Sequence, residues 1–228
     1  MIAEEIRKIT AELPEGVRLV AVSKYHPAEA IREAYEAGQR VFGESHVQEL
    51  ERKRTELPSD IEWHFIGHLQ TNKVKYIAPY VSLIHAVDTP RLLAEISRQG
   101  VKCGRKIPCL LELHVAQEES KYGFSVDECE EFLRSGAWHE LNGVEIRGIM
   151  CMASLTDDEN QIAHEFEQAH LFYIHARETY FANEPSFSEC SWGMSDDYTI
   201  ALRHGSTMIR VGTRIFGNRV YQVPKLQK

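Results

Sequence analysis

The sequence of 228 residues lacks the features that mark membrane, secreted and disulfide-rich proteins. No apolar run approaches the ~20 residues that a membrane-spanning helix needs. The N-terminus MIAEEIRKIT has neither the basic start nor the apolar core of a secretory signal. The five cysteines are odd in number and include no CxxC pair, so neither a disulfide framework nor a zinc knuckle is indicated. We therefore expect a cytoplasmic protein with reduced thiols and no membrane partner.

Positive charge and nucleotide-binding motifs are also scarce. The 26 basic residues against 34 acidic ones give a formal net charge of −8, which repels nucleic acid. No GxGxxG follows the first predicted strand, and GxxxxGK[ST] is absent throughout. The hydrophobic share of 43% is typical of a folded domain, and no linker divides the chain. We expect one domain over residues 1–228, with an N-terminal helix and lead-in over 1–16 and a tail over 218–228.

What the sequence does contain is an alternation of short β-branched runs with stretches of helical period. Ser125–Glu128 and Thr156–Glu159 each have the pattern of a capping box, which predicts a helix start. About eight strand-then-helix units recur, which implies parallel strands joined by helices. At this length the pattern favours a single (β/α)8 TIM barrel with an extra N-terminal helix. A doubly wound open sheet is the competing architecture. The predicted strands cover Arg18–Ser23, Arg40–Phe42, Glu62–Ile66, Val81–Ala86, Pro108–His114, Val144–Met150, Ser188–Ser191 and Thr207–Val211.

Lys24 directly follows the first predicted strand. A barrel carries its functional groups at the carboxyl ends of its strands, so this lysine is expected at the mouth. A desolvated lysine there can lose its charge and form an imine with a carbonyl compound. Position alone favours an ordinary surface lysine, because lysine is rarely buried. A second feature is needed to support the chemical role.

That feature is the segment GSTMIRVGTRIFG at residues 205–217. The loops after the last two strands of a barrel often bind phosphate through backbone N–H groups and a helix start. Gly212 and Thr213 fit such a site, and Ser191 at the end of the preceding strand can add a donor. Taken alone, a Gly-Thr pair is more often a turn. Arg210, on a buried strand, requires a partner such as a carboxylate or a ring nitrogen.

His64 and His68 have a spacing that metal ligands can share, but the segment is a predicted strand followed by a glycine turn. No third ligand is evident, so we predict no metal site. Trp192 is interpreted as packing, although it adjoins Ser191.

The chain resembles the pyridoxal phosphate homeostasis protein family, which in turn resembles the barrel domain of alanine racemase. The resemblance runs through nearly the whole chain, in order. Its stretches are LVAVSK at 19–24, FGESHVQE at 42–49, WHFIGHLQTNK at 63–73, KYGF at 121–124, RGIMCM at 147–152, WGMSDDY at 192–198 and GSTMIRVGTRIFG at 205–217.

The resemblance implies that pyridoxal 5′-phosphate (PLP) is held as a Schiff base, a covalent aldimine, on Lys24. Arg210 matches the arginine that meets the pyridine nitrogen. Ser191, Gly212 and Thr213 match positions that hold the phosphate, and Met150 packs beneath the cofactor. Ser45 is also expected near the ring, although the family usually has asparagine there. Trp192 and Cys190 replace commoner aliphatic residues beside Ser191.

The function implied is intracellular PLP homeostasis without catalysis. An arginine against the pyridine nitrogen weakens the ring as an electron sink. The sequence extends only eleven residues past Gly217, which leaves no room for the second domain of a racemase and favours a monomer. PLP-dependent apo-enzymes are the expected recipients, with Lys73 and Lys121 as candidate transfer lysines. A weak PLP-dependent racemase is the alternative, and an aldolase-like barrel acting on a sugar phosphate is a third, disfavoured one.

Overall fold

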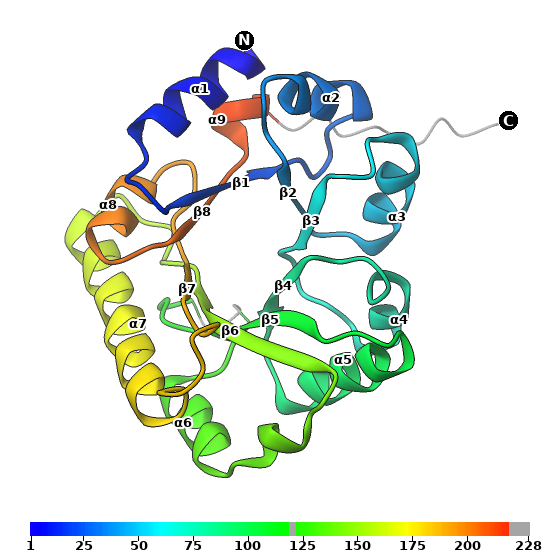
Figure 1. The fold of residues 1–228 in the computed structure, drawn as a ribbon. Coiled ribbons are helices and arrows are strands. Elements are labelled where there is room, and N and C mark those ends of the chain that lie inside the picture. The colour runs from blue at the N-terminus through cyan, green and yellow to red at the C-terminus, as the bar shows by residue number, and fades with distance from the viewer. Residues whose placement is uncertain (119–121, 219–228) are drawn as a thin grey trace, which may run out of the picture.

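The chain folds into a closed barrel of eight parallel strands surrounded by helices (Figure 1). The computed structural model describes residues 1–118 and 122–218. The strands follow one another in chain order, and β1 pairs with β8 to close the ring. The predicted TIM barrel is confirmed, and the open sheet is wrong. The strands are β1 (Arg18–Val22), β2 (Val41–Glu44), β3 (Glu62–Phe65), β4 (Leu83–Val87), β5 (Ile107–Leu113), β6 (Val144–Cys151), β7 (Glu189–Ser191) and β8 (Met208–Val211).

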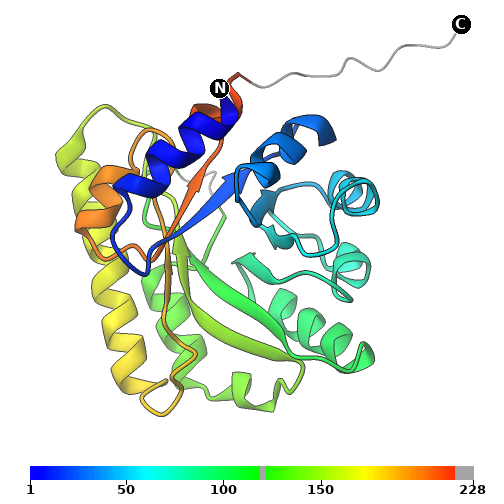
Figure 2. The same cartoon turned by 45° about the horizontal axis from the view of Figure 1, so that its top comes forward.

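The helices form the outer layer, and the first of them confirms the predicted extra N-terminal helix. This helix, α1 (Ile2–Glu12), contacts α2 (Ala28–Glu36) and α9 (Thr213–Phe216) on the outside of the barrel (Figure 2). The other α-helices are α3 (Val47–Glu56), α4 (Val74–Ile77), α5 (Pro90–Lys102), α6 (Val126–Arg134), α7 (Glu159–Thr179) and α8 (Tyr198–Arg203); the 3-10 turns are η1 (Thr71–Lys73) and η2 (Ala137–Glu140). Among the described residues, no helix is long and apolar enough to cross a bilayer.

One of the two predicted helix starts is confirmed and the other is wrong. Ser125 and Glu128 form a reciprocal capping box at the start of α6. At α7 the cap is Asp158, whose carboxylate accepts from the N–H groups of two residues in the first turn. Thr156 instead accepts from the N–H of Asp158, at 3.2 Å. Aspartate is at least as good a cap as threonine, and Asp158 lies nearer the apolar stripe of the helix.

The barrel interior holds a small apolar cluster below a polar layer. The apolar cluster consists of Val20, Leu83, Ala86, Leu110, Met150 and Met208. Side chains two residues further along a strand point to the same face, so Glu112 and Arg210 project inward above Leu110 and Met208. The larger core lies between the strands and the helices.

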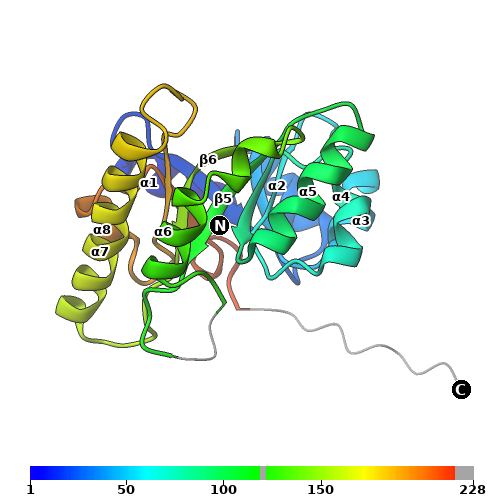
Figure 3. The same cartoon turned by 90° about the horizontal axis from the view of Figure 1, so that it is seen from below.

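The carboxyl ends of the strands lie on one side of the barrel. In Figure 3 the loops that follow β5 and β6 extend from the same, lower side. This is the side on which a TIM barrel carries its functional groups. Residues 219–228, which make up most of the predicted tail 218–228, lie outside the described residues.

Candidate functional site

A cavity of about 250 Å³ lies at the carboxyl ends of the strands and contains four of the predicted site residues. Lys24 lines it from the end of β1, Arg210 from β8, and Gly212 and Thr213 from the turn that begins α9. These residues are far apart in the sequence and meet because β1 and β8 are neighbours, with Val20 paired to Arg210. The remaining lining residues are Val22, His26, Ile66, Met152, Met194, Ser195 and Asp196.

Arg210 is buried and has only neutral hydrogen-bond partners among the described residues. One terminal nitrogen donates to the carbonyl and hydroxyl oxygens of Ser191, at 2.7 and 2.6 Å. The other donates to the carbonyl oxygen of Cys151 at 2.9 Å. The side chain is 4% exposed. The partners therefore orient the guanidinium without neutralising it, and a charge beside a cavity favours an electron-rich acceptor.

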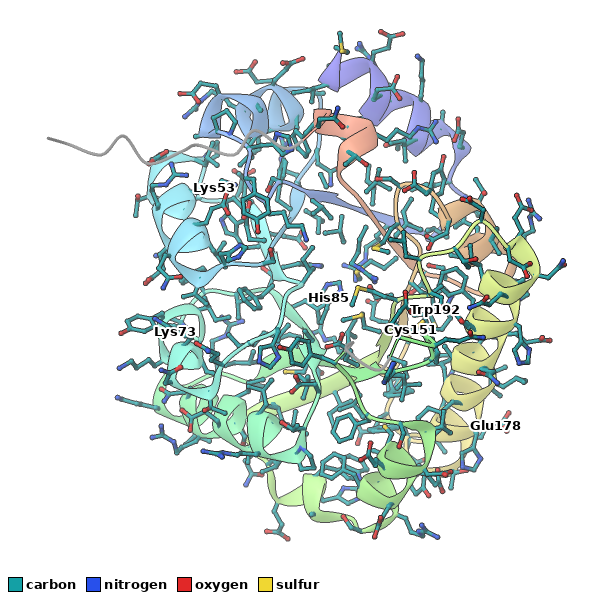
Figure 4. The ribbon with its side chains drawn as sticks, turned by 180° about the vertical axis from the view of Figure 1, so that it is seen from behind. Lys53, Lys73, His85, Cys151, Glu178 and Trp192 are labelled. Atoms are coloured by element: carbon teal, nitrogen blue, oxygen red, sulfur yellow. The ribbon has the colours of Figure 1, made fainter. Side chains whose placement is uncertain are left out.

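A chain of buried hydrogen bonds runs from Arg210 into the barrel. The Ser191 hydroxyl lies 3.0 Å from Nδ1 of His85, and Nε2 of His85 lies 2.9 Å from Nδ1 of His64. Figure 4 places His85 near the centre of the ring of strands. Burial lowers the pKa of His64 to about 3 and that of His85 well below its ordinary value, and the neighbouring cations add to the effect. Both imidazoles are therefore neutral.

The direction of this chain follows from donor and acceptor capacity. Arg210 can only donate, so the Ser191 oxygen accepts from it. Among the described residues, Nδ1 of His85 is the one acceptor bonded to the Ser191 hydroxyl, so the Ser191 proton points to it. His85 then carries its proton on Nε2 and donates to His64. Ser191 is fully buried and does not line the cavity. Its role at the phosphate stays a prediction, while its visible contact is with Arg210.

Ser195 is a cavity residue that the sequence reasoning missed. The chain after β7 turns sharply at Gly193, whose φ of +94° suits glycine, and an added Cβ there would lie 2.6 Å from the Cβ of Ala201. The Asp197 carboxylate accepts from the N–H of Met194 at 2.5 Å. Helix α8 begins after this turn, at Tyr198. The Ser195 hydroxyl accepts from the N–H of Gly212 at 3.3 Å. The motif GMSDD was the available signal.

Ser45 and Met150 lie elsewhere. Ser45 lines a neighbouring cavity of about 390 Å³ together with Lys73, and its hydroxyl lies 3.3 Å from Nδ1 of His46. Met150 is in the apolar cluster inside the barrel, as expected for a packing role, and Met152 lines the first cavity instead. The roles of Ser45 and Met150 toward a ligand stay predictions, and Lys121 lies outside the described residues.

The side chains of His64 and His68 have different partners and do not form a shared site. His64 pairs with His85 inside the barrel, whereas Nδ1 of His68 lies 2.8 Å from the carboxylate of Asp88. Within residues 1–118 and 122–218, no three metal-binding side chains come together. Trp192 is fully buried and donates its indole N–H to the carbonyl oxygen of His204, which agrees with packing.

Glu112 is a buried carboxyl group at the mouth that sequence reasoning also missed. It is 3% exposed, and its Oε2 has no hydrogen-bond partner among the described residues. Burial raises the pKa of Glu112 to about 7; the charge of Asp88 raises it further, and that of Arg210 opposes the increase. Near neutral pH this group changes between a proton donor and a carboxylate.

We expect Glu112→Gln to stabilise the protein at alkaline pH more than at acid pH. The folded pKa of about 7 exceeds the ordinary 4.5, so the folded state binds more protons between these values. The contribution of Glu112 to wild-type stability therefore falls by about 3 kcal/mol as the pH rises through this range, whereas glutamine does not titrate. Urea unfolding at pH 4.5, 6, 7 and 8 measures the difference, with the exposed Glu131→Gln as the control. A difference that is independent of pH would contradict the assignment.

The sequence matches the family model described as alanine racemase, N-terminal domain, over residues 1–220. A pyridoxal phosphate homeostasis protein of Vibrio alginolyticus is 38% identical over 91% of this chain and 89% of its own length. One of Aquifex aeolicus is 34% identical over 96% of each chain.

Solved structures agree with these sequence relations. PipY of Synechococcus elongatus, solved without PLP, superposes with a TM-score of 0.89 at 37% identity and covers 95% of this chain and 100% of its own. The form with PLP bound has a TM-score of 0.86. An alanine racemase of Clostridium difficile shares the fold alone, with 12% identity and a TM-score of 0.78. Barrel, cavity and sequence agree, and the chain belongs to the pyridoxal phosphate homeostasis protein family.

Proposed function

We propose that this protein binds PLP covalently through Lys24 and serves in PLP homeostasis as a carrier. The observation that supports it most is one cavity that combines a lysine, a buried arginine with neutral partners and a Gly-Thr turn. The lysine can bind an aldehyde, the arginine can donate to a ring nitrogen, and the Gly-Thr turn can bind a phosphate. The homeostasis proteins of the same family, and PipY with PLP bound, support the same ligand.

The residues present fit the cofactor. Lys24 would hold the aldehyde carbon as a Schiff base, with loss of water. Arg210, which no anion neutralises directly among the described residues, would donate to the pyridine nitrogen. Gly212, Thr213 and Ser195 would hold the phosphate. We assign Ser191 to orienting Arg210, because its hydroxyl is already bonded to that guanidinium and to His85.

Arg210 is also the reason for proposing a carrier. PLP acts in catalysis as an electron sink, and the sink is strongest when the pyridine nitrogen is protonated. Arginine remains charged and can only donate, so it keeps that nitrogen unprotonated. The cavity rim includes the exposed residues Thr213 and Asp196. Such an open cavity suits release of PLP to apo-enzymes, which we propose as the recipients.

A weak amino-acid racemase is the second candidate, because His26 and Asp196 line the same cavity as Lys24. A racemase needs one base on each face of the substrate carbon, and these two side chains are the potential second bases among the described lining residues. The two proposals differ in whether the α-proton of an amino acid exchanges with solvent.

The test is an absorption spectrum of the purified protein with PLP, followed by an exchange assay. We expect a yellow Schiff-base band and, after borohydride reduction, a pyridoxyl adduct on the peptide that contains Lys24. The PLP-loaded protein in deuterated buffer should leave the α-proton of alanine unexchanged by NMR, with an alanine racemase as the positive control. Absence of the band would refute PLP binding, and sustained exchange that depends on Lys24 would refute the carrier role.

A further inference from the structure

Lys53 is a fully buried lysine outside the cavity. It lies on the barrel side of α3 (Figure 4) and is 0% exposed. Its ammonium group has three acceptors at 2.7 Å: the carbonyl oxygen of Ser23 and one carboxylate oxygen each of Glu44 and Glu49. The contacts with Ser23 and Glu44 are hydrogen bonds, and the contact with Glu49 is an ion pair. Burying an ion pair stabilises a protein little compared with apolar packing, so this arrangement calls for another explanation.

The same groups hold both chain neighbours of Lys24. The Ser23 hydroxyl donates to the Glu44 carboxylate at 2.6 Å. The backbone N–H of Tyr25 donates to the Glu49 carboxylate at 2.8 Å. The contacts of Lys53 and its two carboxylates therefore converge on the residues immediately before and after the cavity lysine.

These residues form a tight turn with an unusual backbone. The N–H of His26 donates to the carbonyl oxygen of Ser23 at 3.1 Å, so Lys24 is the second residue of a four-residue turn. Tyr25, the third, has a φ of +68° and is the one non-glycine residue with positive φ in the described chain. A type II turn needs positive φ at its third position and usually has glycine there. Tyrosine adopts that backbone only where its surroundings hold it.

We propose that Lys53, Glu44 and Glu49 form a positioning cluster that holds the Ser23–His26 turn and so directs Lys24 into the cavity. Lys53 bonds the carbonyl that closes the turn, and Glu49 bonds the N–H of the residue with positive φ. The cluster acts through Lys24 and does not touch the ligand. The inference rests on the proposed function only for its effect on PLP binding, since the effect on the turn is independent of any ligand.

The first test compares Lys53→Met with Leu50→Ala. Methionine keeps much of the side-chain volume but removes the two hydrogen bonds and the two ion pairs of the ammonium group. Leu50 is a fully buried residue of the same helix, and its truncation destabilises α3 but removes no hydrogen bond or ion pair of the cluster. At a temperature where all proteins are folded, we expect Schiff-base formation with PLP to be about tenfold slower in Lys53→Met. Leu50→Ala should remain at the wild-type rate, even with the lower Tm.

The second test is a rescue. Tyr25→Gly removes the steric cost of positive φ, so the turn can form without the cluster. We expect Lys53→Met/Tyr25→Gly to recover most of the lost rate. Hydrogen exchange of the Tyr25 and His26 backbone amides gives a readout without PLP. Lys53→Met should accelerate the exchange of both amides about tenfold, whereas Leu50→Ala should leave both exchange rates unchanged.

The outcomes separate the two proposals. If the wild type forms no Schiff base but the two amides respond to Lys53→Met, the proposed function fails and the positioning of the turn stands. If the wild type binds PLP and Lys53→Met binds it equally fast, the cluster proposal is overturned. It is also overturned if Leu50→Ala slows binding as much, or if Tyr25→Gly restores nothing.

Discussion

Protein carrying Lys24→Ala is expected to show no Schiff-base band with PLP and no borohydride-stable label on the peptide that contains residue 24. Lys24 is the one lysine among the described residues that line the cavity with Arg210, Gly212 and Thr213. The contacts to the ring and phosphate remain in the variant, so residual noncovalent binding is expected. We expect its apparent affinity to be roughly a hundredfold weaker, equivalent to about 3 kcal/mol.

Two matched variants make this result specific. Lys24→Arg keeps the positive charge but cannot form an imine, and should lose the band as completely as alanine does. Lys73→Ala removes a lysine of the neighbouring cavity and should keep the band and the label on Lys24. A reduced adduct that persists in Lys24→Ala would show that another lysine carries the cofactor. Peptide mass mapping identifies the labelled residue in each case.

His64→Leu is expected to destabilise the protein at neutral pH and to be progressively less harmful as the pH falls. At neutral pH the substitution leaves Nε2–H of His85 without its acceptor, which costs about 1–3 kcal/mol. Burial lowers the pKa of His64 from 6.5 to about 3, so below pH 6.5 the unfolded wild-type chain takes up a proton that the folded one does not. The contribution of His64 to wild-type stability is therefore lost as the pH falls towards 3, and leucine removes that loss.

Relative to wild type, the unfolding free energy of His64→Leu should rise by about 3 kcal/mol between pH 6.5 and 4, so that at pH 4 the variant is at least about as stable as the wild type. Urea unfolding across this range measures it, with His164→Leu on the exposed face of α7 as the control. Imidazole ¹⁵N shifts provide a second measurement: His85 should carry its proton on Nε2. A constant difference, or a charged His64 at pH 5, would contradict the buried neutral chain.

Two buried glutamates have the opposite effect to His64 on how the stability of the wild type depends on pH. Burial raises the pKa values of Glu44 and Glu112 to about 7, so the folded state binds the additional protons between pH 4.5 and 7. Over that interval they offset the two histidines. The contribution of these four groups to stability should therefore be nearly flat down to about pH 4.5 and decline below it.

The sequence by itself determined the fold class and the outline of the cavity. Short β-branched runs alternating with helical stretches are local patterns, and eight such units in one chain admit few topologies. Lys24, Arg210, Gly212 and Thr213 were identified because each is at a strand end or in the turn after the last strand. Barrel closure brings all such positions to one mouth, so their order in the chain was sufficient.

Only the tertiary structure decided which side chains share the cavity and which lie behind it. Ser191 and Ser195 are four residues apart, and the turn at Gly193 decides that Ser195 lines the cavity while Ser191 bonds Arg210. Lys53 has no local signal, since on a helix it resembles any solvated lysine. Its burial arises because α3 packs over the ends of β1 and β2. There the ammonium group of Lys53 donates to the carbonyl oxygen of Ser23 and to the carboxylate of Glu44. Contacts between elements depend on packing in three dimensions, and no spacing along one strand or helix encodes them.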